Sequence, residues 1–280
     1  MTRQNYYKLR LVRAQLSVDE KLVLDLVRRE RMRQPRLGGR KLRVVLGDEI
    51  RQARVRLGRD RFFDLLGEHD LLIARRRRTT GTTNSRHGFG VYTNLAKSLV
   101  LTGSHELWVS DITYVRTREG FMFAALIMDA FTRVIVGFDC SDSLEIEGAL
   151  RALSKAVGQL PAQARPVHHS DRGSQYCCHA YIDKLKKHDL PISMTEENHC
   201  YENAQAERLN GTLKQEYGLG ETFARKKDVT PAVREAVALY NPHRPHEALG
   251  YRIPMQVHAS RANSKTKSAK ERGQSPAPRI

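Results

Sequence analysis

Cysteine and tryptophan are scarce in this chain, and long apolar runs are missing. Its 280 residues include 4 cysteines and 1 tryptophan, which excludes the disulfide-rich scaffolds of small secreted proteins. No apolar stretch is long enough to cross a membrane, and no signal peptide precedes the first motifs. We therefore expect a cytoplasmic protein with reduced thiols and no membrane partner.

The few cysteines lie near histidines, which raises the alternative of a zinc site. The residues concerned are His168, His169, Cys177, Cys178, His179, His199 and Cys200. The two central cysteines are adjacent and therefore lack the C-x2–4-C spacing of zinc-binding pairs. The pattern does not favour zinc.

Acidic residues are too few to balance the basic ones. The chain has 31 Asp and Glu against 48 Lys and Arg, a net charge of +17. Residues 1–90 hold 23 basic and 10 acidic side chains, residues 91–260 hold 19 and 20, and residues 261–280 hold 6 and 1. A concentrated cationic segment attracts polyanions, so the pattern predicts salt-sensitive binding to nucleic acid. An acidic membrane surface is the competing partner, but no lipidation motif or amphipathic membrane helix accompanies the charge.

The basic N-terminal segment has helical periodicity in three places. The predicted helices cover residues 17–34, 39–51 and 59–72. Ser17 and Glu20 have the spacing of a capping box, which predicts that the first helix begins there. The third helix has an apolar stripe opposite charged residues, which is typical of a helix-turn-helix with Arg59 and Arg61 facing a DNA groove. An ordinary three-helix bundle with a solvated basic face is the alternative.

Composition divides the chain into four parts. We predict a DNA-binding region over residues 1–74, a linker over 75–100, a catalytic core with a C-terminal helical extension over 101–259, and a disordered basic tail over 260–280. The linker begins with RRRRTTGTTNS, and its arginines are candidate phosphate contacts: Arg75, Arg76, Arg77 and Arg78.

One carboxylate lies inside a strongly β-like stretch. Asp111 belongs to WVSDITYV, which begins at Trp108. Its β-branched and aromatic residues predict a buried strand. A buried carboxylate pairs, neutralises or binds a metal ion, because an unpaired buried charge is unfavourable. Asp111 is therefore a candidate metal ligand, with a salt-bridged core aspartate as the alternative.

Two further carboxylates complete a candidate set. Asp171 follows a short apolar stretch and precedes a Gly/Ser turn, so we place it at the carboxyl end of a strand, where α/β sheets bind ligands. Glu207 lies in a predicted helix with Asn203 and Lys214 on nearly the same stripe. The alternatives are an aspartate that caps the turn and a solvated helix face. Three carboxylates suit a pair of Mg²⁺ or Mn²⁺ ions, and Asn203 and Lys214 are candidate DNA contacts.

The elements of this region predict a mixed α/β sheet covered by helices. The expected strands cover residues 105–116, 121–129, 134–140, 166–170 and 192–195, and the expected helices cover 144–160 and 178–188, followed by the helix that carries Glu207. Three antiparallel strands followed by alternating helices and strands bring Asp111 and Asp171 near Glu207.

Four blocks in order carry a family resemblance. They are WVSDITYV from Trp108, HHSDRGSQY from His168, CYENAQAERLNGTLKQEY from Cys200 and YNPHRPHEALGYRIP from Tyr240. In these blocks the chain resembles the OrfB-type transposases of bacterial insertion sequences, whose catalytic core is similar to that of retroviral integrases. The resemblance implies a ribonuclease H-like fold and a helix-turn-helix-like N-terminal region.

The resemblance also implies an activity. Asp111, Asp171 and Glu207 would bind two Mg²⁺ or Mn²⁺ ions and catalyse cleavage at the ends of an insertion sequence and strand transfer by the 3′-hydroxyl. Lys214 would contact the element's DNA end. The expected partners are double-stranded DNA of the ends and the target, further copies of the chain, and the protein of an upstream reading frame. A metal-dependent nuclease and a non-catalytic DNA-binding regulator are the alternatives.

Overall fold

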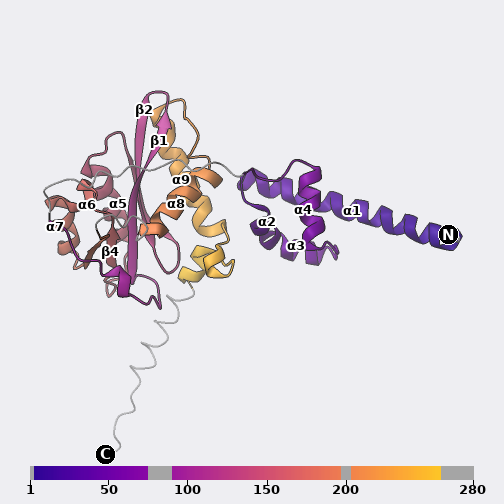
Figure 1. The fold of residues 1–280 in the computed structure, drawn as a ribbon, viewed down its shortest axis with the longest axis horizontal. Helices are drawn as coiled ribbons and strands as arrows, with labels where there is room; N and C mark the ends of the chain where they lie inside the picture. Colours follow the sequence, from indigo (N-terminus) through magenta and orange to yellow (C-terminus); the bar gives the residue numbers. More distant parts are fainter. Residues whose placement is uncertain (1–2, 75–89, 197–202, 260–280) are drawn as a thin grey trace, which may run out of the picture. The chain divides into compact units, whose positions relative to one another are not determined.

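The structure of the protein is a computed structural model that describes residues 3–74, 90–196 and 203–259. The chain divides into two compact units, Met1–Arg78 and Thr79–Ile280, which Figure 1 draws together and which are described separately below. The predicted tail over 260–280 and most of the predicted linker lie outside the described residues. No helix in the described part of the chain is long and apolar enough to cross a membrane.

The first unit consists of helices packed around one apolar core. They are α1 (Arg3–Arg33), α2 (Gly39–Val45), α3 (Gly47–Gln52) and α4 (Arg59–Glu68). Val23 and Val27 of α1, Leu42 of α2 and Phe62 and Leu66 of α4 are buried together in this core. The expected all-helical N-terminal region is confirmed.

The helix boundaries in this unit differ from the predictions. The first helix begins at Arg3 instead of Ser17, because the residues before Ser17 are mostly good helix formers and outweigh the capping signal. The predicted helix over 39–51 is interrupted at Leu46, which ends α2 and precedes α3. The last helix ends at Glu68, and Asp70 adopts a left-handed conformation (φ 55°) that terminates it.

The second unit is built on a five-stranded mixed sheet. Its strands are β1 (Leu107–Thr117), β2 (Gly120–Asp129), β3 (Ile135–Ser141), β4 (Val167–Ser170) and β5 (Ile192–Met194). The order across the sheet is β3-β2-β1-β4-β5. The first three strands are antiparallel neighbours, and β4 is parallel to both β1 and β5. The mixed ribonuclease H-like sheet expected from the sequence is confirmed, with each strand within two residues of its predicted bounds at either end.

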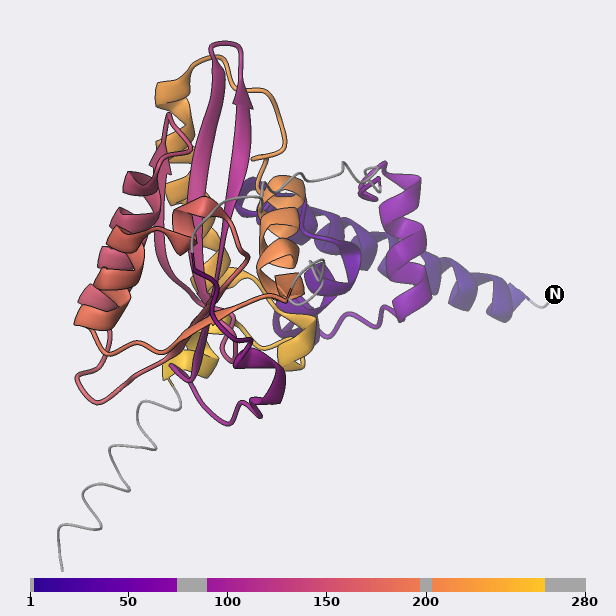
Figure 2. The ribbon, with the colours of Figure 1, turned by 60° about the vertical axis from the view of Figure 1, so that its left-hand side comes forward.

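Helices cover both faces of this sheet. They are α5 (Ile146–Gly158), α6 (Ser174–Cys177), α7 (His179–Lys187), α8 (Ala204–Glu216) and α9 (Val229–His243). Alternate residues of β1 point to opposite faces. Val109 packs with Leu213 of α8 and Val233 of α9, whereas Trp108 packs with Leu153 of α5 and Tyr181 of α7. Figures 1 and 2 show these two helical layers on either side of the sheet.

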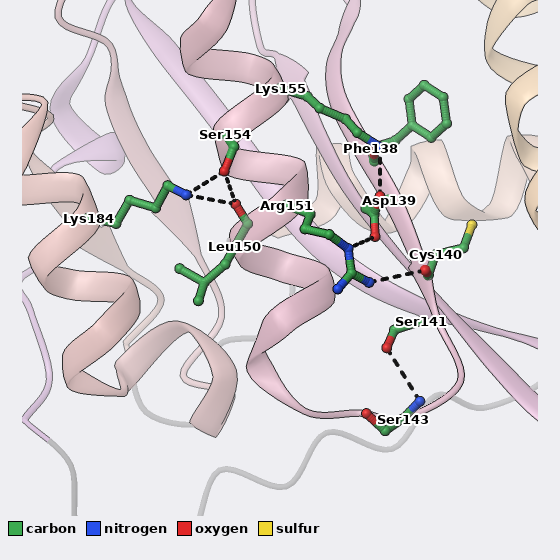
Figure 3. A network of polar contacts seen from close by, with 10 residues as sticks. All are labelled: Phe138, Asp139, Cys140, Ser141, Ser143, Leu150, Arg151, Ser154, Lys155 and Lys184. Carbon is green, nitrogen blue, oxygen red and sulfur yellow. Dashed lines mark hydrogen bonds and ion pairs between the residues drawn. The ribbon is translucent and has the colours of Figure 1, made fainter.

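Polar contacts fasten α5 to its neighbours (Figure 3). Arg151 Nε and Lys155 Nζ each lie 2.6 Å from a carboxylate oxygen of Asp139 on β3. On the other side of α5, Lys184 Nζ of α7 donates to the carbonyl oxygen of Leu150 at 3.2 Å. These contacts lie on the α5 face of the sheet and leave the α8 face to the residues described next.

Two peripheral segments contact the sheet. The backbone amides of Leu95 and Ala96 donate to Ser193 Oγ of β5 at 2.9 and 3.3 Å, so part of the segment assigned to the linker lies against the core. His258, in the last described helix over 254–259, lies with its Nδ1 3.1 Å from Thr132 Oγ1. Both ends of the described part of the second unit are therefore tied to the sheet.

Candidate active site

Asp111 lies where β1 loses its neighbour on one side. β4 pairs with β1 only at Leu107, Trp108 and Val109. Beyond that point Asp111 remains paired with Leu126 of β2. One carboxylate oxygen, Oδ1, accepts from the backbone amide of the next residue at 2.9 Å. Asp111 therefore lies on the central strand, two residues beyond the end of its pairing with β4.

Asp171 lies just beyond the end of the parallel pair formed by β1 and β4. The last paired residues are Val109 and His169, two residues before Asp111 and Asp171 in their respective segments. Asp171 follows the last residue of β4, and its Oδ1 accepts from the amide of Gly173 at 3.0 Å. A Cβ at position 173 would lie 3.0 Å from that oxygen, which is a tight contact. Asp171 thus closes a turn, as the alternative interpretation supposed, and its charge also acts on Asp111.

Helix α8 carries Glu207 within electrostatic range of Asp111. Asn203 precedes the first residue of α8, is buried, and donates from Nδ2 to the carbonyl oxygen of Ser110 at 2.9 Å. This bond joins the start of α8 to the residue before Asp111. Glu207 lies in the first turn of the helix and is exposed. The amide of Asn203 is directed into the protein interior, so Asn203 connects elements instead of presenting its side chain to solvent.

The three carboxylates interact electrostatically. Burial, together with the negative charges of Asp171 and Glu207, raises the pKa of Asp111 to about 7, against the hydrogen bonds from the Ile112 amide and Asn210. Repulsion of this kind is relieved by a cation, and carboxylate oxygens are the ligands that Mg²⁺ and Mn²⁺ prefer. Within residues 3–74, 90–196 and 203–259, no three His, Cys, Asp or Glu side chains lie together so that they could hold a metal ion. The donors fit a divalent cation in type, and they lie within electrostatic range.

Lys214 lies near this site, two turns beyond Glu207 on α8. Its Nζ is 4.1 Å from the centre of the Tyr114 ring. The pKa of Lys214 is lowered overall, because burial lowers it more than the nearby Asp111 carboxylate raises it. Lys214 is therefore a partly buried ammonium group that interacts electrostatically with Asp111.

The candidate DNA contacts of the first unit differ in their surroundings. The side chain of Arg59 is 68% exposed, and its guanidinium carbon lies 5.9 Å from the centre of the Phe63 ring. Arg61 is bonded to Glu20 at 2.7 Å and to Glu68 at 2.5 Å, so its charge is matched within the unit. The remaining candidates, Arg75, Arg76, Arg77 and Arg78, lie outside the described residues.

Two sets of polar residues near the site were not identified from the sequence. Asn210 donates from Nδ2 to Asp111 Oδ2 at 2.7 Å. Its position three residues after Glu207 on one helix is a signal that could have identified it. His168 lies with Nε2 2.7 Å from Ser110 Oγ and 3.0 Å from the Tyr181 hydroxyl. Nothing in the local sequence indicates that this histidine joins β1 to α7.

His168 is a structural histidine. It is fully buried, and burial, with a smaller contribution from His169, lowers its pKa to about 3. The ring is therefore neutral at physiological pH and bonds a serine and a tyrosine. The second histidine, His169, lies with Nδ1 2.8 Å from Ser193 Oγ.

The chain matches two family models described as integrase core domain, over residues 102–200 and 188–254. It is 33% identical over 234 residues to the insertion element IS600 uncharacterized 31 kDa protein of Shigella sonnei, which covers 83% of this chain and 85% of that protein. It is 34% identical to the transposase for insertion sequence element IS629 of Shigella sonnei, over 77% of this chain and 71% of that protein. The chain belongs to the insertion-sequence transposases with an integrase core.

The transposase is a DNA-recombining enzyme, a polynucleotidyl transferase of the DDE type, and this family depends on divalent metal ions. The resemblance stated from the sequence is confirmed. Among solved structures, the catalytic core domain of HTLV-2 integrase in complex with magnesium aligns at a TM-score of 0.44 with 14% identity, over 56% of this chain and 97% of that chain.

Proposed function

We propose that Asp111, Asp171 and Glu207 are the catalytic residues of this transposase and that they bind two Mg²⁺ or Mn²⁺ ions. The observation that supports the proposal is that Asp111 lies partly buried on the central strand, within electrostatic range of the carboxylates of Asp171 and Glu207. The parallel pairing of β1 with β4 and the bond from Asn203 to Ser110 support the proposal, because they link the three elements that carry these residues.

The proposed reaction cleaves one strand at the end of an insertion sequence and then joins the freed 3′-hydroxyl to a second phosphodiester. Both steps are in-line displacements on phosphorus, so one site serves both and no covalent enzyme intermediate forms. When bound, divalent ions would activate the attacking oxygen and stabilise the leaving oxygen. Two hydrogen bonds hold the Asp111 carboxylate. We propose that Lys214, whose ammonium group lies near Asp111, binds a phosphate of the element's end.

The remaining DNA contacts are proposed from charge and exposure. Arg59 is exposed, and its ion pair with the exposed Asp60 is long, at 3.9 Å, so we propose that it contacts a groove or phosphate. The run Arg75–Arg78 adds further basic charge. For Arg61 and Asn203 we propose a role in holding the fold, because their polar atoms are bonded within the protein. An electrophoretic shift with Arg59→Ala and Arg61→Ala tests this division, since loss of binding with a folded Arg61→Ala protein would contradict it.

We propose that the four segments predicted from the sequence have separate functions. Residues 1–74 bind double-stranded DNA at the element ends, 75–100 connect, 101–259 catalyse on end and target DNA, and 260–280 form a basic tail. The reaction brings together two ends of one element, so we propose a homo-oligomer on DNA in the cytoplasm, with an upstream-frame protein as a possible second component. Sedimentation with and without end DNA tests the oligomer, and a monomer on two-ended DNA would contradict it.

The central test is Mg²⁺- or Mn²⁺-dependent cleavage and joining of a labelled DNA end. Asp171→Asn and Glu207→Gln are expected to lose both products. The matched controls are Asp183→Asn on α7 and Glu235→Gln on α9, both exposed carboxylates outside the proposed site, which are expected to retain activity. Cleavage without joining by the wild-type chain would favour a nuclease. Activity only after addition of an upstream-frame protein would identify that partner, and activity in both triad variants would contradict the proposed site.

A further inference from the structure

Asn210 connects the helix that carries Glu207 to the carboxylate of Asp111. Its side chain is buried, with 8% of its surface exposed. The amide presents its nitrogen to this carboxylate, and Nδ2 donates to Asp111 Oδ2 at 2.7 Å. The other carboxylate oxygen accepts from the Ile112 amide at 2.9 Å. The two donors hold the carboxylate from both sides and fix its orientation.

The other end of the Asn210 amide is unsatisfied. Oδ1 is buried and has no hydrogen-bond partner among the described residues. A buried acceptor without a partner is unfavourable, and native proteins retain few of them. Asn210 also lies three residues after Glu207 and four before Lys214, so all three follow one stripe of α8. The unsatisfied oxygen therefore lies on the stripe of the helix that borders the site.

We propose that Asn210 is a positioning residue for metal binding. Its Nδ2 fixes the Asp111 carboxylate relative to α8 and hence to Glu207, and its Oδ1 is available to accept a hydrogen bond from a water molecule of a bound ion. Mg²⁺ and Mn²⁺ keep several waters when they bind to proteins, so such an acceptor has a natural partner. This inference rests on the proposed function of the triad, because it assigns Asn210 a role toward the ions that the triad binds.

The test measures Mn²⁺ affinity in the absence of DNA, by electron paramagnetic resonance of the free ion. Asn210→Ala removes both amide atoms and keeps a strong helix former, so α8 is expected to remain intact. We expect its Mn²⁺ dissociation constant to rise about 10- to 100-fold, the usual effect of removing a hydrogen bond to a metal ligand. The Mg²⁺ concentration that gives half-maximal cleavage is expected to rise in parallel.

Asn241→Ala is the matched control. The amide of Asn241 on α9 bonds both the backbone nitrogen and the carbonyl oxygen of Ile135 on β3, at 2.9 and 3.0 Å, outside the proposed site. This variant is expected to lose thermal stability and to bind Mn²⁺ as the wild type does. Asn210→Leu is a second variant that lacks the hydrogen bond to Asp111, and its side chain fills the space of the amide.

Three outcomes distinguish a role of Asn210 in metal binding from a failure of the proposed triad and from a purely structural role of Asn210. Wild-type Mn²⁺ affinity in folded Asn210→Ala or Asn210→Leu overturns the role of Asn210, while weakened binding by Asp171→Asn in the same assay keeps the triad. Absence of Mn²⁺ binding by the wild type, or unchanged binding by Asp171→Asn, overturns the proposed function and this inference with it. Unfolding of both Asn210 variants assigns the residue to the fold and also overturns the role.

Discussion

Replacing Asp111 by asparagine is expected to stabilise the metal-free protein at neutral and alkaline pH. An aspartate carboxyl in an unfolded chain has a pKa of 3.8, and in the folded protein burial and the neighbouring carboxylates raise the pKa of Asp111 to about 7. Between these two values the unfolded chain releases the proton and the folded chain keeps it. The wild type therefore loses stability as pH rises from about 4 to about 7 and loses no more from this group above that.

The size of the effect follows from the shift. About three pKa units at 1.36 kcal/mol each give an upper limit of about 4 kcal/mol. An asparagine at position 111 has one acceptor in place of two, and a lost hydrogen bond costs about 1 kcal/mol. Asn210 reduces that loss, because its Oδ1 has no partner and can accept from the new amide. We expect Asp111→Asn to be about 2–4 kcal/mol more stable than the wild type at pH 8 and nearly equal to it at pH 4.

Urea unfolding in EDTA measures this directly. Trp108 is the only tryptophan, is fully buried, and lies on β1 three residues before Asp111, so its fluorescence reports the second unit alone. Asp183→Asn, at an exposed carboxylate, is expected to change stability by less than about 0.5 kcal/mol at either pH. Mg²⁺ should stabilise the wild type and not Asp111→Asn. Equal stability of the two proteins at pH 8, or a difference that does not depend on pH, would refute the electrostatic argument.

Three further predictions concern the fold and the DNA contacts. Arg244 binds Glu216 of α8 through two hydrogen bonds of 2.7 and 2.9 Å, and Arg244→Ala removes both. The free energy of unfolding should fall by about 3–5 kcal/mol, measured by Trp108 fluorescence in urea. Gly137→Ala places a Cβ 2.4 Å from the carbonyl oxygen of an α5 residue and should destabilise the protein by about 1–3 kcal/mol, visible as a lower thermal midpoint. Arg59→Ala should reduce the slope of log affinity against log salt by about one in DNA titrations, and an unchanged slope would exclude a phosphate contact.

Local signals in the sequence were reliable for the catalytic unit and less so for the first unit. The strands of the sheet follow from short runs of β-branched and aromatic residues, and the structure places each within two residues of its predicted bounds at either end. The first helix was placed wrongly because Ser17 and Glu20 match a capping box, whereas α1 runs through them from Arg3. A cap signal is worth about 1 kcal/mol and yields to a longer run of helix formers.

Residue partners that are far apart in the sequence were not predictable. Arg61 resembles a DNA contact by its position near the start of a helix, but it pairs with Glu20, which lies 41 residues earlier. In the sequence alone, Asn210 has the pattern of a solvated helix residue. Its partner, Asp111 on β1, lies 99 residues earlier in the chain and is reached only because α8 packs against β1. Both assignments depend on packing, which local periodicity does not specify.

The sequence by itself determined the order of the elements, the uneven distribution of basic charge, and the four blocks that place the chain among the insertion-sequence transposases. These properties depend on residue type and spacing along the chain. Only the tertiary structure decided which side chains are already bonded, and that burial together with the charges of Asp171 and Glu207 raises the pKa of Asp111 to about 7. Burial and Coulomb energies depend on distances through space, and those distances exist only once β1, β4 and α8 have packed together.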